Sequence, residues 1–227
     1  MGANRPPPGL ARTDDRLAGQ EQTSARFWGR HANRYDRIAR LLNGNFDKMV
    51  GRLAELVDGS GQVLEVAAGT GLVTQAMAGV VEHLVATDAS EAMLDILRGR
   101  MADLGASNVQ VRTANALALD FEDGEFDAVV AANVLHLLPE PSVCLSEMRR
   151  VLRPNGLLCV PTFCDGDTST AHIVSRLLRL GGFRVVTRFS GGDVGALVQA
   201  AGFTVEHRER FPGVLPLWLV VGRRDSE

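Results

Sequence analysis

The stretch VLEVAAGTGLVT, residues 63–74, constrains the fold more than any other part of the chain. It opens on an apolar, β-branched run around Glu65 that is typical of a buried parallel strand. Five small residues follow, and then the apolar start of a helix. Such a turn lets backbone N–H groups approach a ligand closely at the carboxyl end of a parallel strand. The pattern predicts a nucleotide-type crevice; a tight turn without a ligand is the alternative.

Composition narrows the class of protein and its partners. The 227 residues are 45% hydrophobic, enough for one domain with a sizeable core. The net charge of −3, with both signs interspersed, gives no electrostatic basis for binding nucleic acid. Three cysteines without metal-ligand spacing predict no metal site and favour a reducing compartment. No apolar run is long enough for stable membrane insertion. We therefore expect a cytoplasmic protein, a monomer or homodimer, with a small-molecule partner.

The chain divides into three predicted regions. Residues 1–22 carry Pro6, Pro7 and Pro8 with scattered charges, which predicts a disordered tail. Residues 23–58 carry aromatic and aliphatic side chains at helical spacing and predict a small N-terminal helical cap, with one helix over 45–57. Because residues 23–50 precede the first strand, they could close over a site as a lid or pack permanently on the sheet. Residues 59–227 predict the ligand-binding domain.

Strand and helix patterns alternate through the middle of the chain, which predicts an α/β fold with a mostly parallel sheet and helices on both faces. The predicted strands span residues 63–66, 84–88, 109–113, 126–131 and 156–162. The predicted helices span residues 72–80, 91–104, 141–152 and 192–201. Residues 204–211 and 214–223 flank Pro212 and Gly213 and predict an antiparallel hairpin.

Polar residues stand at the carboxyl ends of the predicted strands, where open α/β sheets bind their ligands. Glu65 lies within the first strand, where it could attract a cationic group or anchor the loop. Asp88 ends the second strand and could accept from both hydroxyls of a ribose, with a solvent-facing carboxylate as the alternative. Asn115 follows the third strand and suits an adenine edge or a turn. Asn133 follows the fourth strand among small residues that leave room for a ligand.

Six segments resemble a known family in order and content: RYDRIARLLNGNFDKMV, EVAAGTG, ATDASEAML, TANALALDFEDGEFDAVV, NVLHLL and EMRRVLRPNGLL. They are similar to the class I S-adenosylmethionine-dependent methyltransferases, in the group of ubiquinone/menaquinone-biosynthesis-type small-molecule methyltransferases. This resemblance implies a Rossmann-like, seven-stranded, mostly parallel sheet whose last strand is antiparallel. It implies S-adenosylmethionine as the cofactor and a small molecule as the methyl acceptor.

The resemblance also implies roles for individual residues. The loop would cradle the methionine part of the cofactor, Asp88 would hold the ribose, and other positions would contact the adenosine or lie beside the methionine part. The expected cofactor-binding residues are Glu65, Ala67, Gly69, Thr70, Gly71, Asp88, Ala89, Met93, Asn115, Ala116 and Asn133. Two of them depart from the family pattern. Ala67 stands where the first loop glycine is usual, and Asn115 stands where an adenine-contacting Asp is usual.

Methyl transfer to oxygen or carbon can also need a general base. His136, a few residues beyond the fourth strand, is the first catalytic candidate, and a buried structural histidine is the alternative. His31 and Tyr35 in the predicted cap are further candidates, although Tyr35 also fits a packing role.

Two other functions stay open at this stage. One is a regulatory or scaffold protein that binds the cofactor without methyl transfer. The other is an NAD(P)-dependent reductase, against which stand Thr74 in place of the third glycine of the dinucleotide fingerprint and a hairpin in place of a second mononucleotide-binding half.

Overall fold

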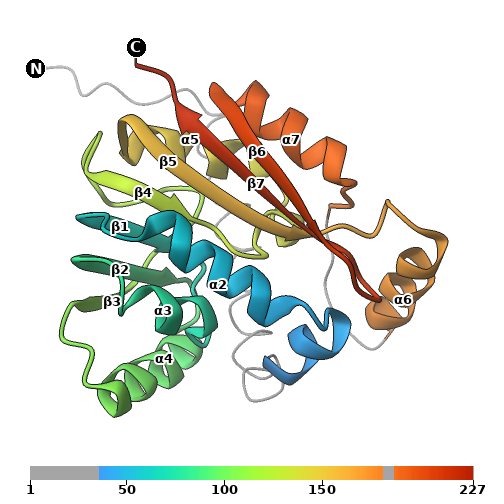
Figure 1. The fold of residues 1–227 in the computed structure, drawn as a ribbon, viewed down its shortest axis with the longest axis horizontal. Coiled ribbons are helices and arrows are strands. Elements are labelled where there is room, and N and C mark those ends of the chain that lie inside the picture. The colour runs from blue at the N-terminus through green and yellow to red at the C-terminus, as the bar shows by residue number, and fades with distance from the viewer. Residues whose placement is uncertain (1–35, 181–186, 227) are drawn as a thin grey trace, which may run out of the picture.

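The structure is a computed structural model that describes residues 36–180 and 187–226. One seven-stranded sheet forms its centre, in the order β3-β2-β1-β4-β5-β7-β6 (Figure 1). The strands are β1 (Gln62–Val66), β2 (His83–Asp88), β3 (Val109–Thr113), β4 (Phe126–Val130), β5 (Leu152–Phe163), β6 (Phe203–Phe211) and β7 (Leu217–Arg224). The first five strands pair in parallel, and β7 runs antiparallel to both of its neighbours. The predicted fold class is confirmed.

Helices cover both faces of this sheet. On one face α2 (Phe46–Val57) and α3 (Leu72–Met77) pack against β1, β4 and β7, and α4 (Glu91–Leu104) covers β2. On the other face α5 (Pro141–Val151) and α7 (Gly191–Ala200) share a core with the opposite side chains of β1, β4 and β5 and with residues of β6 and β7; α7 lies against β6 and β7. Because strand side chains alternate between faces, each buried strand supplies both cores. The near-continuous apolar strand sequences follow from burial on both sides.

Helix α2 belongs to the core. Its apolar residues recur three and four apart, and Met49, Leu53 and Val57 are fully buried against the sheet. The helix predicted over 45–57 is thus present, but its burial is that of a permanent core element. The lid hypothesis therefore no longer extends to residues 46–50. The predicted tail and the first part of the predicted cap, residues 23–35, lie outside the described residues, so the division of the chain into tail, cap and domain stays a prediction.

Two elements differ from the sequence prediction. Strand β5 begins at Leu152, because Leu152 pairs with Phe126 before Leu157 pairs with Ala128. The intervening RPNG residues, which lie between the predicted helix and the predicted strand, form an irregularity in the ladder, with Asn155 at a φ of 61°. Helix α6 (Ser169–Leu180) was not predicted. It follows β5 and contributes Ala171 to the core shared with α2 and β7.

Candidate functional site

The site is built on the turn from β1 to α3, residues 67–71, which we call the cofactor loop. Ala67, Gly69 and Gly71 all adopt left-handed backbone conformations, with φ of 58°, 57° and 86°. A Cβ at Gly71 would lie 2.9 Å from Cγ of Leu97 on α4, so packing requires glycine there. A Cβ at Gly69 would meet no heavy atom within 4 Å. The loop is held tightly against α4 and leaves open space in front of Gly69.

Asp88 joins the carboxyl end of β2 to the cofactor loop. Its Oδ2 accepts from the Gly69 N–H at 2.9 Å, and its Oδ1 accepts from the Ser90 N–H at 2.8 Å. Burial raises the pKa of this carboxyl, and the two backbone donors oppose that rise. Each carboxylate oxygen has a second lone pair, so Asp88 can hold the loop and also accept from hydroxyls of a ligand.

Glu65 is buried directly behind the cofactor loop, with 1% of its surface exposed. Its Oε2 accepts from Thr74 Oγ1 on α3 at 2.6 Å. Burial raises its pKa to about 8, and the nearby Asp88 carboxylate acts in the same direction. The side chain is therefore mostly neutral at pH 7. In this state it anchors α3 to β1, a role that differs from the two that the sequence suggested.

A residue that sequence reasoning missed also reaches the loop. Thr70 is 1% exposed, and its Oγ1 donates to Asp36 Oδ1 at 2.5 Å. The other carboxylate oxygen of Asp36 pairs with the Arg100 guanidinium on α4. Asp36 begins a described helical segment, residues 36–42. Only its position beside Tyr35, in the segment that resembles the family, could have drawn attention to it.

The predicted adenine side lies across β2 and β3. Thr113 pairs with Asp88 in the ladder, and the Ala114 N–H donates to the Asp88 carbonyl oxygen at 3.2 Å. Asn115 Oδ1 accepts from the Leu117 N–H at 2.6 Å, so its side chain forms a turn and its amide oxygen is already engaged. Ala116 is buried beside it, Met93 is buried at the start of α4, and Ala89 is half-buried next to Asp88.

The carboxyl ends of β4 and β5 form the neighbouring part of the site. Asn133 has a φ of 56°, a conformation that Asn tolerates better than most residues. Its N–H donates to the Pro161 carbonyl at 2.7 Å, and its Oδ1 accepts from the Phe163 N–H at 3.1 Å. The side chain that was expected beside the methionine part therefore ties the two strand ends together.

His136 lies just beyond Asn133, in the short 3₁₀ helix η1 (Leu135–Leu137). It is 9% exposed, and its Nδ1 is buried without a hydrogen-bond partner in the described part of the chain. Burial lowers its pKa to about 4, and the Asp165 carboxylate partly opposes this shift. The imidazole is neutral at pH 7, the form that can accept a proton. The buried Thr162 Oγ1, on β5, also has no partner among these residues.

Further polar residues stand beyond β5. Arg188 Nε donates to Asp165 Oδ2 at 2.9 Å, and the same guanidinium contacts His172 on α6. These contacts link α6 to the residues that follow β5. The two other catalytic candidates, His31 and Tyr35, lie outside the described residues.

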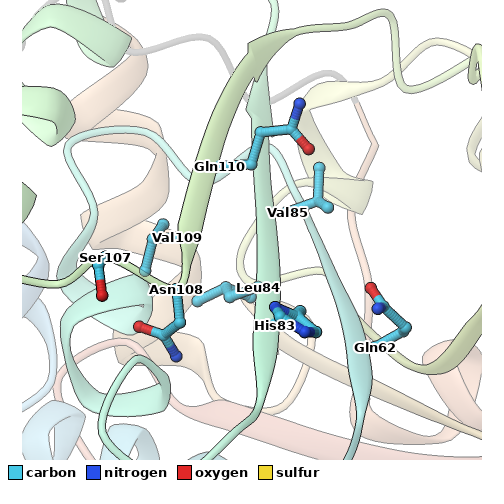
Figure 2. A pocket seen from close by; sticks show the side chains of 8 residues that line it. All are labelled: Gln62, His83, Leu84, Val85, Ser107, Asn108, Val109 and Gln110. Atoms are coloured by element: carbon cyan, nitrogen blue, oxygen red, sulfur yellow. The ribbon is translucent and has the colours of Figure 1, made fainter.

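A cavity of about 340 Å³ lies at the opposite end of the sheet (Figure 2). It is lined by the first residues of β1, β2 and β3, including Gln62 and His83, and by Ser107 and Asn108 just before β3. The Asn108 side chain donates to the carbonyls of Ala78 and Val81, so it serves the fold. The lining carries no carboxylate or guanidinium, and it is remote from the carboxyl ends of the strands, where the conserved geometry of open α/β sheets places ligands.

Metal chemistry has no candidate centre in the described ranges. No group of three or more His, Cys, Asp or Glu side chains there could hold a metal ion. Cys144, Cys159 and Cys164 are buried. No helix among the described residues is long and apolar enough to cross a membrane.

Known proteins are similar to this chain in sequence and in fold. Residues 64–160 match the methyltransferase domain family. The chain is 35% identical over 158 residues to the demethylmenaquinone methyltransferase of Clavibacter sepedonicus, covering 68% of this chain and 62% of the relative. It is 35% identical over 139 residues to the ubiquinone/menaquinone biosynthesis C-methyltransferase UbiE of Pseudomonas fluorescens, covering 58% and 54%. The chain thus spans about half to two thirds of these relatives.

The fold also matches solved structures. A SAM-dependent methyltransferase from Aquifex aeolicus superposes with a TM-score of 0.67 at 21% identity, covering 86% of this chain and 97% of that one. The fold and the matched domain resemble those of the class I S-adenosylmethionine-dependent methyltransferases. The two relatives named above are of the ubiquinone/menaquinone-biosynthesis type. The NAD(P)-dependent reductase and the scaffold protein are not favoured.

Proposed function

We propose that this protein transfers the methyl group of S-adenosylmethionine to a small-molecule acceptor bound at the carboxyl ends of β4 and β5. The observation that carries the proposal is the cofactor loop, which is fixed by Asp88 and Leu97 and leaves open space at Gly69. When bound, the cofactor supplies an electrophilic methyl group and a good leaving group. The chain must then orient the acceptor, exclude water and accept a proton where one is released.

The described residues fit this cofactor. Asp88 offers carboxylate lone pairs at the end of β2, the position from which a ribose is held in nucleotide-binding sheets. Ala89, Met93, Asn115 and Ala116 are proposed to flank the adenosine. Glu65, Ala67, Gly69, Thr70, Gly71 and Asn133 are proposed to shape the space for the methionine part. The amide of Asn115 would contact the adenine only alongside its bond to Leu117.

We propose His136 as the general base for the acceptor. Its buried Nδ1 is a hydrogen-bonding atom for which the described residues supply no partner. An acceptor hydroxyl that donates to the ring would lose its proton to it as the methyl group is transferred. His31 and Tyr35 remain proposed contributors from the chain before residue 36. The names of the two relatives make a reduced naphthoquinone the first acceptor class to test.

Calorimetry tests the cofactor and an activity assay tests the acceptor. We expect S-adenosylhomocysteine and S-adenosylmethionine to bind the purified protein and NADH not to bind. Binding of NADH without S-adenosylhomocysteine would overturn the proposal. Methyl transfer is followed with radiolabelled cofactor and a panel of reduced naphthoquinones, benzoquinones and simple phenols, and product mass spectrometry shows whether carbon or oxygen is methylated.

We also propose a cytoplasmic location and a monomer or homodimer that does not bind nucleic acid. An odd number of cysteines without metal-ligand spacing suits a reducing compartment. Size-exclusion chromatography with light scattering measures the oligomeric state directly.

A further inference from the structure

Asp36 bridges three parts of the chain that are far apart in sequence. Its Oδ1 accepts from Thr70 Oγ1 in the cofactor loop, 34 residues away. Its Oδ2 pairs with Arg100 on α4, 64 residues away. Asp36 itself begins the helical segment 36–42, whose Ala39 is buried in the core beside α2. One carboxylate thus connects this segment, the loop and α4.

The hydrogen bond between Asp36 and Thr70 is short and buried. The Thr70 side chain is buried, and a hydroxyl that donates to a carboxylate at 2.5 Å makes a charge-assisted hydrogen bond. Without Asp36, the hydroxyl would be buried without this acceptor, which is costly. The Arg100 guanidinium holds the second oxygen, so the first is kept pointing at Thr70.

Asp36 is one of three residues that restrain the cofactor loop. Asp88 holds the Gly69 N–H from the side of β2, and Leu97 lies against Gly71 from α4. Thr70, between these two glycines, is held from the third side by Asp36. Ala67 has a Cβ and a left-handed conformation, so the loop carries backbone strain there and these restraints matter for its geometry.

We infer that Asp36 is a positioning residue for cofactor binding: it fixes the cofactor loop through Thr70 in the conformation that admits the cofactor. This inference rests on the proposed function, because the loop must be the cofactor site. A loop that is preordered loses less conformational freedom on binding, which strengthens affinity. The effect belongs to cofactor binding and its KM, because Asp36 acts through another residue.

The test compares Asp36→Ala and Thr70→Val with their double variant and a matched control. Asp47→Ala is the control, because Asp47 forms an exposed ion pair at 3.0 Å with Arg40, on the same helical segment as Asp36. Calorimetry with S-adenosylhomocysteine is done at a temperature where circular dichroism shows every variant folded. We expect each single variant to weaken binding about tenfold, the double variant to be no worse than either, and the control to bind like wild type.

Kinetics and a second arm separate positioning from simple stabilisation. The KM for S-adenosylmethionine should rise about tenfold in Asp36→Ala while kcat stays within about twofold. Asp36→Asn keeps an oxygen for Thr70 and should recover much of the affinity. If folded Asp36→Ala and Thr70→Val bind like wild type, or if their effects simply add, the inference is wrong. Should Asp36→Ala not fold, Thr70→Val alone decides by the same criterion. Wild-type protein that binds no S-adenosylhomocysteine would instead refute the proposed function.

Discussion

Buried polar groups at the ends of β1 and β2 differ in their hydrogen bonding from those at the ends of β4 and β5. At β1 and β2, Glu65, Thr70 and Asp88 are all hydrogen-bonded within the protein, and these bonds shape the cofactor loop. At β4 and β5, the described structure leaves His136 Nδ1 and Thr162 Oγ1 buried without partners.

Buried polar atoms are nearly always paired in folded proteins, so unpaired ones call for a reason. Arg100 Nη1 on α4 is also buried without a partner in the described residues, so unpaired atoms are not confined to the ends of β4 and β5. We propose that the unpaired atoms at β4 and β5 meet the acceptor, whereas the hydrogen bonds at β1 and β2 fix the cofactor loop.

His136→Phe gives the largest expected effect, because it removes one of the unpaired polar groups at β4 and β5. Removal of a general base lowers kcat by about 10²- to 10⁴-fold, measured as methyl transfer at saturating cofactor. Phenylalanine suits the site beside the Phe163 ring, at 6.4 Å between ring centroids, so the melting temperature should not fall. His83→Gln, at the exposed start of β2, is the control. Unchanged kcat would make His136 a structural residue.

Gly71→Ala tests the cofactor loop. The φ of 86° and the Leu97 side chain at 2.9 Å together oppose any Cβ, and we expect a loss of roughly 2–4 kcal/mol in the free energy of unfolding. Urea denaturation measures it. Gly79→Ala is the matched control, since no atom lies within 4 Å of its built Cβ and its φ is not left-handed. Equal stability of the two variants would show that α4 moves aside.

Asp88→Ala should weaken S-adenosylhomocysteine binding by roughly one to two powers of ten. It removes both the acceptor for the Gly69 and Ser90 N–H groups and the carboxylate proposed for the ribose. Asp120→Ala serves as control, because the Asp120 side chain is fully exposed and its ion pair with Arg112 is long, at 3.7 Å. Calorimetry at a fixed salt concentration compares them. Wild-type affinity in Asp88→Ala would mean that neither role matters for binding.

The smallest effect concerns pH and Glu65. Its folded pKa of about 8 lies above the unfolded value, so the folded state binds the extra proton between them. Stability from this group is fully present below pH 4.5 and is lost as pH rises through 8. Between pH 7 and pH 8 the loss is about 1 kcal/mol, which Glu65→Gln should abolish. Denaturation at both pH values, without cofactor, checks this. A parallel decline in wild type and variant would place the titration elsewhere.

Much of the fold followed from the sequence alone. Residues 63–74 pass from a strand pattern through small residues to a helix pattern, and local sterics favour a tight turn at such small residues. The central strands follow from short apolar runs, and amphipathic helices such as α2 follow from a periodicity of 3.6 residues, because those patterns are local. The positions of Asp88, Asn133 and His136 at strand ends followed from the same topology.

Only the tertiary structure decided how those residues are used. The partners of Asp36, Thr70 and Arg100 come from segments 34 and 64 residues apart, a distance over which no local pattern carries information. The turn role of Asn115 and the strand tie of Asn133 depend on which backbone donor each amide oxygen meets in the folded chain. Likewise α2, which the sequence left as lid or core, is core because its apolar stripe meets the face formed by β1 and β4. The hydrophobic pattern determines which helices and strands form. The partners of side-chain hydrogen bonds depend on how those elements pack, because packing brings distant segments together.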